Sequence, residues 1–345
     1  DKILVLITRN YGVSDPILNM GIPELLLERG YKVITLSHLP GHALDIADEY
    51  ENLYYPFGQH ILSGAKLIAH HPNLYAVYLT NHGCGPDTML SHLFKQEMGD
   101  KPYLQIEVDE HFSNVGVITR IEAFLNSLNH RPVEVLPKDF VLEQVDIRPC
   151  HLPAVPEKDF PLWLPPLGEY TASLTGYFRA QGVDAHALPH LSAHALSLGC
   201  AETSAKEYLP FPALLGGILA QQEADPAPAQ FLIPQTRGAE ADGQYARVIR
   251  AVLDRRGNQS AKLVSPMLET LPATAQDRDA LFRALLAGDI LYAAPAAMRA
   301  GIAAAWDTLP GWAQLHKAAV EIGRCPATGR RLATVGTPLC LTELD

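Results

Sequence analysis

The sequence is poor in cysteine, and the few cysteines that it has are far apart. Its 345 residues include only five, at Cys84, Cys150, Cys200, Cys325 and Cys340, and no two of them form a CxxC pair. Structural zinc sites draw their thiolates from closely spaced pairs, and this chain has none. An odd and dispersed set of cysteines also does not suit a disulfide framework. We therefore expect reduced thiols and a cytoplasmic location.

Long apolar runs and basic clusters are lacking as well. No uninterrupted apolar stretch reaches the roughly 18 residues of a membrane-spanning helix, so we expect no membrane association. The formal net charge is −11 without any long basic run, which argues against nucleic acid as a partner. The chain begins on an apolar segment rather than on a signal peptide, and it lacks an initiator methionine. We expect it to be part of a longer polypeptide.

Three common nucleotide-binding and catalytic signatures are absent too. No G-x-G-x-x-G or P-loop pattern occurs, and no G-x-S-x-G marks a serine nucleophile. Arg9-Asn10-Tyr11 follows the first predicted strand, where a phosphate could bind at the start of a helix.

Short apolar runs alternate with helical patterns along the first 130 residues. This alternation predicts an α/β fold with a mainly parallel, doubly wound sheet. The expected strands are 3–8, 32–36, 75–79 and 103–108, and the expected helices are 22–29, 58–70, 89–98 and 116–128.

The alternation stops at a proline-rich stretch and then resumes. We expect a first Rossmann-like domain over 1–130, a linker over 131–166 that packs on the surface, and a second Rossmann-like domain over 167–345 with alanine-rich helices. The second half has expected helices at 171–181, 211–222, 245–256, 277–305 and 312–322, and expected strands at 184–188, 230–234, 261–265 and 331–341.

Cys84 is the residue that most favours a chemical role. It lies in Asn81-His82-Gly83-Cys84-Gly85-Pro86-Asp87, directly after the predicted strand 75–79. Ligands of parallel sheets bind at the carboxyl ends of the strands. The flanking glycines let a bulky group approach the backbone, so Cys84 is a candidate ligand of a metal cluster.

Several segments of the first 130 residues resemble one known family. These are Asn19-Met20-Gly21-Ile22-Pro23, His71 to Asn81, Gly83-Cys84-Gly85-Pro86-Asp87, Lys101-Pro102-Tyr103-Leu104, Glu107 to His111 and Thr119 to Leu125. They are similar to the 2-hydroxyacyl-CoA dehydratase superfamily, whose D-component acts on 2-hydroxyglutaryl-CoA. More closely, they resemble the dehydratase-like region of acyl-CoA dehydratase activase-related proteins.

The resemblance implies Rossmann-like domains around an iron–sulfur cluster that is held by cysteines from separate loops. Members of the family transfer electrons at low potential, and the true dehydratases remove water from 2-hydroxyacyl-CoA thioesters. It further implies acyl-CoA and an ATP-dependent activase as partners, the latter either within the same chain or as a separate one.

At two of the three cysteine motifs the sequence departs from the family. Cys84 matches the first motif. The second, usually G-K-E-C-x-P, reads Ala205-Lys206-Glu207-Tyr208-Leu209-Pro210, and the third, usually G-P-C-R-x-G-Q-Y, places Glu240 where a cysteine is expected. A cubane cluster requires soft thiolate ligands, and a phenol and a carboxylate are poor replacements.

The resemblance thus makes Cys84, Tyr208 and Glu240 the cofactor-site positions. Asp87, Glu110, His111, Lys206 and Glu207 are expected near the same cleft between the domains.

Three hypotheses remain open. The first is a cluster-free, dehydratase-like module of a larger activase-type protein, with a structural or docking role and no cofactor. The alternative is an enzyme, a lyase or redox component, whose [4Fe-4S] cluster is anchored by Cys84, with Cys200 as a possible replacement ligand. The third is a zinc or small-ligand site of Cys84, His82 and a carboxylate. Asp109-Glu110-His111 could supply metal-binding or acid–base groups at a strand end.

Overall fold

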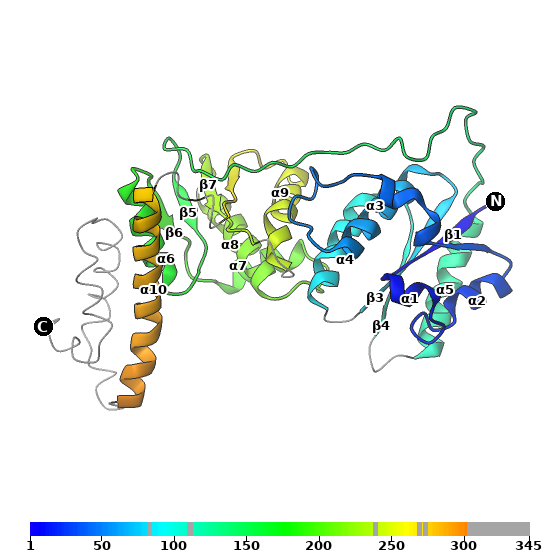
Figure 1. The fold of residues 1–345 in the computed structure, drawn as a ribbon, viewed down its shortest axis with the longest axis horizontal. Helices are drawn as coiled ribbons and strands as arrows, with labels where there is room; N and C mark the ends of the chain where they lie inside the picture. Colours follow the sequence, from blue (N-terminus) through cyan, green and yellow to red (C-terminus); the bar gives the residue numbers. More distant parts are fainter. Residues whose placement is uncertain (82–83, 109–112, 237–240, 268–270, 272–274, 302–345) are drawn as a thin grey trace, which may run out of the picture. The chain divides into compact units, whose positions relative to one another are not determined.

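The chain folds into two four-stranded parallel β-sheets with helices around each, as the computed structural model shows (Figure 1). The structure describes residues 1–81, 84–108, 113–236, 241–267, 271 and 275–301. The predicted helix at 312–322, the predicted strand at 331–341, and Cys325 and Cys340 lie outside the described residues. The α/β architecture with parallel sheets, predicted from the alternation of strands and helices, is confirmed.

The first sheet has the order β2-β1-β3-β4. Its strands are β1 (Ile3–Ile7), β2 (Lys32–Thr35), β3 (Leu74–Asn81) and β4 (Leu104–Val108). β3 is buried along its length except at Asn81, as expected for an inner strand covered on both faces. Because the chain runs outward from β1 in both directions, the strand order reverses between β1 and β3. Such a reversal is where open α/β sheets bind their ligands.

Helices cover both faces of the first sheet (Figure 1). α2 (Ile22–Glu28) and α5 (Asn114–Asn129) share one apolar cluster with the sheet, in which Leu26, Ile121 and Leu125 are buried. α3 (Pro56–His70) and α4 (Gly85–Met98) pack together on the other face. Three short helices connect these elements, at α1 (Asn10–Ser14), η1 (Leu36–His38) and η2 (Pro40–Ala43).

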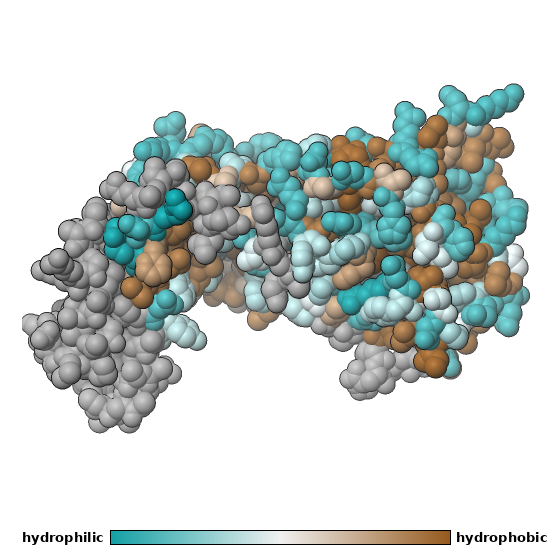
Figure 2. All heavy atoms as spheres, viewed as in Figure 1, coloured by the Kyte–Doolittle hydropathy of each residue, from teal (hydrophilic) through white to brown (hydrophobic). Residues whose placement is uncertain are grey.

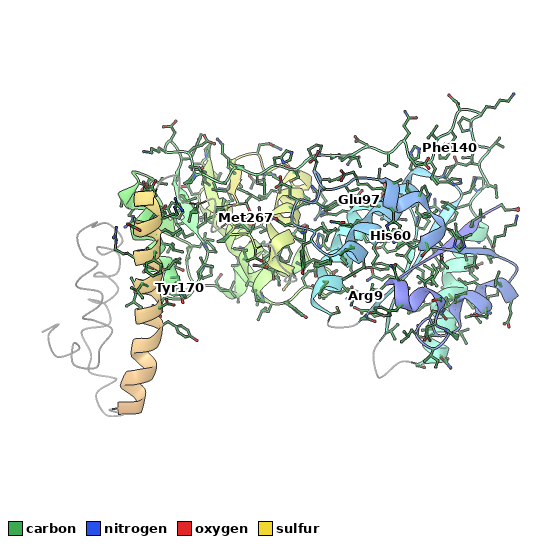
Figure 3. All side chains as sticks on the ribbon, in the orientation of Figure 1. Arg9, His60, Glu97, Phe140, Tyr170 and Met267 are labelled. Atoms are coloured by element: carbon green, nitrogen blue, oxygen red, sulfur yellow. The ribbon has the colours of Figure 1, made fainter. Side chains whose placement is uncertain are left out.

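The second sheet has the order β6-β5-β7-β8, which is the same pattern as the first. Its strands are β5 (Leu162–Leu164), β6 (Ala185–Ala187), β7 (Ala229–Leu232) and β8 (Ala261–Val264). The helices of this part are α6 (Tyr170–Ala180), α7 (Ala193–Ala201), α8 (Pro210–Ala224), most of α9 (Tyr245–Arg255) and α10 (Ala275–Gly301). α10 packs on α6, and the hydroxyl of Tyr170 donates to Asp289 at 2.5 Å (Figure 3).

The chain forms two compact units whose boundaries differ from the expected domains. The first unit consists of Asp1–His151, Thr203–Tyr208 and Arg237–Val248, and the second of the remaining residues. Two segments that the sequence assigns to the second domain therefore belong to the first unit. The expected linker is also divided, because β5 lies within 131–166 and forms an inner strand of the second sheet.

Residues 131–151 run over the surface of the first unit and are attached to it at several points. Glu134 exchanges two hydrogen bonds with the side chain of Asn73, at 2.8 and 2.9 Å. The ring of Phe140 stacks on His70 with centroids 5.0 Å apart (Figure 3). Prolines suit such a segment, since it needs no ladder of backbone hydrogen bonds.

No helix in the described part of the chain combines the length and apolar character needed to cross a membrane.

Candidate functional site

Cys84 and Arg9 lie at the carboxyl ends of the two strands between which the strand order reverses. Arg9 follows β1 and Cys84 follows β3, and these strands are paired from Ile3↔Leu74 to Ile7↔Tyr78. Cys84 is the N-cap residue of α4, with an extended backbone at φ −76° and ψ 122°. Its position at the end of a parallel strand is therefore the one that the sequence predicts.

Arg9 joins Cys84 to Asp87. Its Nη2 donates to Cys84 Sγ and, at 2.9 Å, to Asp87 Oδ1, while the backbone N–H of Asn81 donates to Asp87 Oδ2 at 3.0 Å. The guanidinium also lies over the ring of Phe57, 4.5 Å from its centroid (Figure 3). Arg9, which lies where the sequence allows a phosphate to bind at the following helix, is thus held by groups of the protein itself.

The electrostatics of this cluster favour a charged Arg9. Burial by itself would lower the pKa of Arg9, but the hydrogen bond and charge of Asp87, with a contribution from Cys84, outweigh burial and raise it. Burial raises the pKa of the nearby Tyr55 to about 12, and electrostatic contributions from Asp87 and Cys84 add to that shift. Tyr55 therefore remains a neutral phenol at physiological pH.

The loop Thr203–Tyr208 brings the second motif to the same end of α4. A β-carbon placed on Gly85 would lie 3.7 Å from the hydroxyl oxygen of Tyr208, so the phenol stands next to the Cys84 loop. Lys206 Nζ lies 2.8 Å from Glu107 Oε1 on β4. Two of the segments matched to the cysteine motifs of the family are thereby close in space.

Glu207 holds this loop in place. Its carboxylate accepts from His92 Nδ1 at 2.7 Å, from the N–H and hydroxyl of Ser204 at 3.0 Å each, and from the N–H of Lys206 at 3.1 Å. Burial would raise the pKa of Glu207, but these hydrogen bonds and His92 outweigh it and lower the pKa. Ala205 has a φ of +63°, a left-handed conformation that costs about 1 kcal/mol for a residue with a β-carbon. The four bonds to Glu207 maintain that conformation.

A cavity of about 240 Å³ lies beside this loop. Its walls carry the hydroxyl-bearing residues Thr80, Thr88, Ser91 and Tyr208, together with Asn81 and Ala205. The charged lining residues are Asp87, Glu107 and Lys206. The Oγ1 atom of Thr80 is buried and has no hydrogen-bond partner.

The structure brings together five of the eight predicted site residues, namely Cys84, Asp87, Lys206, Glu207 and Tyr208. The sequence predicts a cleft between the domains, but every residue that lines the cavity belongs to the first unit. The reason is that Thr203–Tyr208 returns to pack on α4 through the His92–Glu207 contact. Five other candidate residues lie outside the described residues, namely His82, Asp109, Glu110, His111 and Glu240. The short helix η3 (Ala241–Gln244), which begins directly after Glu240, contacts α4.

The described donors around Cys84 do not fit an iron–sulfur cluster. Cys84 is the only thiol among them, its sulfur accepts from a guanidinium, and the neighbouring motif supplies a phenol. Cys200, the possible replacement ligand, lies in α7 of the second unit. Among the residues that the structure describes, no three His, Cys, Asp or Glu side chains are grouped so that they could hold a metal ion.

Two contributors to this site had no role assigned from the sequence. Thr80 is a polar residue inside a run of buried strand residues, and that exception to the apolar pattern was the available signal. His92 binds the carboxylate of Glu207 through its Nδ1 at 2.7 Å. Its partner is 115 residues away, and no local pattern indicates such a contact.

The fold and the site together define an α/β protein with a polar cavity at the carboxyl edge of a parallel sheet. Comparison of the chain with protein-family models, with curated proteins and with solved structures finds no match.

Proposed function

We propose that this chain is a dehydratase-like module of two Rossmann-like domains that has lost its iron–sulfur cluster and has a structural or docking role in a larger activase-type protein. The observation that carries the proposal is the place of Tyr208. The segment that resembles the second cysteine motif lies against the Cys84 loop, yet it brings a phenol where a cluster would need a thiolate.

The contacts around Tyr208 support a retained architecture without the cofactor. The loop is held by hydrogen bonds from His92 and Ser204 to Glu207, and none of these needs a metal ion. Arg9 places a positive charge and N–H donors beside the single thiol. The loop can therefore keep its position after the ligands of a cluster have been replaced.

A docking role is supported by large apolar side chains exposed on the first unit. Ile17 and Leu18, just before α2, are 83% and 48% exposed, and Val115, in the first turn of α5, is 72% exposed. α2 and α5 share one apolar cluster, and both begin at the carboxyl end of the sheet. Apolar patches lie among polar ones on the surface of this part of the molecule (Figure 2). Contiguous exposed apolar patches are typical of association surfaces, and the partners we propose are other domains of the same polypeptide or a separate ATP-dependent activase.

Iron and acid-labile sulfide, measured after anaerobic reconstitution, test the loss of the cluster. We expect less than one iron per chain and no absorption band near 400 nm, both for the unaltered protein and for Cys84→Ser. About four irons per chain, lost in Cys84→Ser, would overturn the proposal in favour of a [4Fe-4S] electron-transfer or 2-hydroxyacyl-CoA dehydratase module. A Tyr208→Cys, Glu240→Cys variant is the matched control, because it restores a cysteine at both motif positions and should gain iron.

A further inference from the structure

Eight of the nine residues that line the cavity beside Lys206 carry a polar group in the side chain. Apart from Ala205 and the ring of Tyr208, its lining consists of hydroxyl, amide and charged side chains. These groups can fix the orientation of a ligand that carries several polar groups of its own. At about 240 Å³ the cavity suits a small polar molecule.

One buried hydroxyl in this cavity lacks a hydrogen-bond partner. Thr80 is 3% exposed, and its Oγ1 is bonded to no other group of the described protein. Buried polar atoms are nearly always paired, and leaving one unpaired is costly. A polar group of a ligand would satisfy Thr80, which makes this hydroxyl an independent sign of an occupant.

The charges at the cavity are balanced and have opposite signs. Lys206 and Glu107 are paired at 2.8 Å with side chains that are 24% and 32% exposed. Asp87 is already neutralised by Arg9 at 2.9 Å. A phosphate or a dicarboxylate would meet the two carboxylates of the cavity without enough positive charge to offset them. A cation alone would leave Lys206 facing a like charge.

We propose that this cavity binds a small zwitterion of the α-amino acid class, with its carboxylate on Lys206, its ammonium group on Glu107 and a polar group on Thr80. The ligand would separate the Lys206–Glu107 pair and give each member a new partner of the correct sign. Because a partly exposed ion pair contributes little stability, its separation costs little. The neighbouring hydroxyl groups of Thr88 and Ser91 suit a polar rather than an apolar ligand side chain.

Titration calorimetry on the full chain, with each of the twenty standard L-amino acids, tests the proposal. We expect saturable binding of at least one of them at millimolar concentration or below. Two analogues of the best ligand should bind at least about tenfold more weakly: the 2-hydroxy acid, which lacks the ammonium group, and the decarboxylated amine. The proposal is overturned if no amino acid binds, or if the hydroxy acid or inorganic phosphate binds as tightly as the amino acid.

Variants of the chain separate this site from nonspecific binding. Lys206→Met and Thr80→Val should each weaken binding at least about fivefold, whereas Thr80→Ser, which keeps the hydroxyl, should restore it. Lys32→Met, which removes a lysine from an exposed ion pair with Asp1, is the matched control and should leave binding unchanged. Equal binding by all four variants would also overturn the proposal. The result is independent of iron content, so the failure of this proposal and the failure of the cluster-free module are distinguishable.

Discussion

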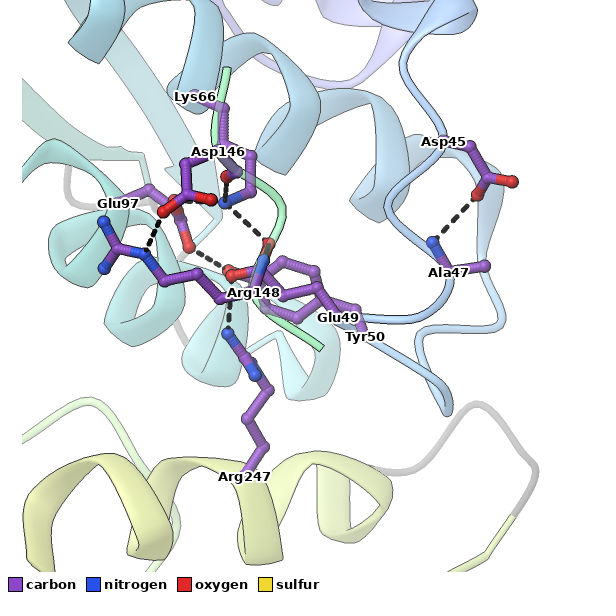
Figure 4. A network of polar contacts seen from close by, with 9 residues as sticks. All are labelled: Asp45, Ala47, Glu49, Tyr50, Lys66, Glu97, Asp146, Arg148 and Arg247. Carbon is purple, nitrogen blue, oxygen red and sulfur yellow. Dashed lines mark hydrogen bonds and ion pairs between the residues drawn. The ribbon is translucent and has the colours of Figure 1, made fainter. Parts of the chain in front are cut away.

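Lys66 is the cation at the centre of a buried charge network in the first unit, and its replacement by methionine should be strongly destabilising (Figure 4). Its Nζ lies 2.7 Å from Glu49 Oε2 and 2.9 Å from Glu97 Oε2. Arg247 reaches Glu49 Oε1 at 2.9 Å and lies over the ring of Tyr50, whose hydroxyl donates to Glu97. The side chains of Lys66 and Glu49 are only 5% and 1% exposed, so solvent cannot replace the lost ammonium group.

The size of the effect follows from the charges that Lys66→Met leaves behind. Glu49 would keep Arg247, but Glu97 would lose the ammonium group that lies 2.9 Å from its carboxylate. Breaking a buried ion pair by removing one member typically costs about 3–5 kcal/mol, which corresponds to a fall of roughly 10 °C in the melting temperature of a unit of this size. The added substitution Glu97→Gln should recover part of the loss, because it removes the unpaired carboxylate.

Native-state hydrogen exchange on peptides from α3 and α4 is the suitable assay, since it reports the free energy of unfolding of the first unit. Tryptophan fluorescence cannot replace it, because all three tryptophans belong to the second unit. Lys32→Met is the matched control, as the Lys32–Asp1 pair is 68% and 70% exposed and should contribute less than about 1 kcal/mol. If Lys66→Met costs no more than Lys32→Met, the argument for a stabilising network is refuted.

Three further predictions follow from other parts of the molecule. Gly216→Ala should destabilise the second unit by about 3 kcal/mol in denaturant unfolding, since its methyl group would lie 1.8 Å from a carbonyl oxygen of α7. Gly217→Ala should be neutral or slightly stabilising, because its methyl group would make an ordinary van der Waals contact of 3.7 Å with Leu188. Burial, together with the charge of a neighbouring histidine, lowers the pKa of His60 to about 4, below its ordinary 6.5. The unfolded chain therefore binds the proton at His60 more tightly, so the free energy of unfolding should fall by about 3 kcal/mol between pH 6.5 and 4. His60→Leu should lose this pH-dependent contribution, and a variant with the same pH dependence of unfolding as the unaltered chain would contradict the assignment to His60. His92→Leu should speed hydrogen exchange in the loop of Glu207 at least about tenfold, because it removes a buried partner of that carboxylate, and unaltered exchange would count against that contact.

Much of the fold could be predicted because its strands are apolar runs with turn residues at their ends. β1, β3 and β4 are such runs, and α5 follows the helical spacing of Val117, Ile121 and Phe124. β5 could not be recognised, because it has only three residues between Pro161 and Pro165. α7 was missed for a different reason. Its alanine-rich sequence lacks an amphipathic stripe, and it packs on α8 through the close approach of Gly199 and Gly216.

The candidate site was predictable only in part, for a physical reason. Cys84 could be located because the end of a parallel strand follows from local sequence. The approach of Tyr208 came only from a motif match, since no local property of 203–208 indicates that this loop returns to the first unit. The pairing of Arg9 with Asp87 likewise required the order of the strands, which brings the ends of β1 and β3 together.

The charged groups at the carboxyl edge of the first sheet differ in how readily a ligand could reach them. The Arg9–Asp87 and His92–Glu207 pairs are largely buried, and Glu207 is bound by four hydrogen bonds, so both pairs serve mainly to hold Cys84 and the 203–208 loop. Lys206 and Glu107 are more exposed, with 24% and 32% of their side-chain surface accessible. A ligand should therefore replace the present partner of Lys206 or of Glu107 at a lower free-energy cost than the partners in the two buried pairs. Lys206 and Glu107 line the same cavity as Thr80, whose hydroxyl is unpaired. Ligand binding at this edge should thus perturb Lys206 while leaving Glu207 and the loop backbone in place.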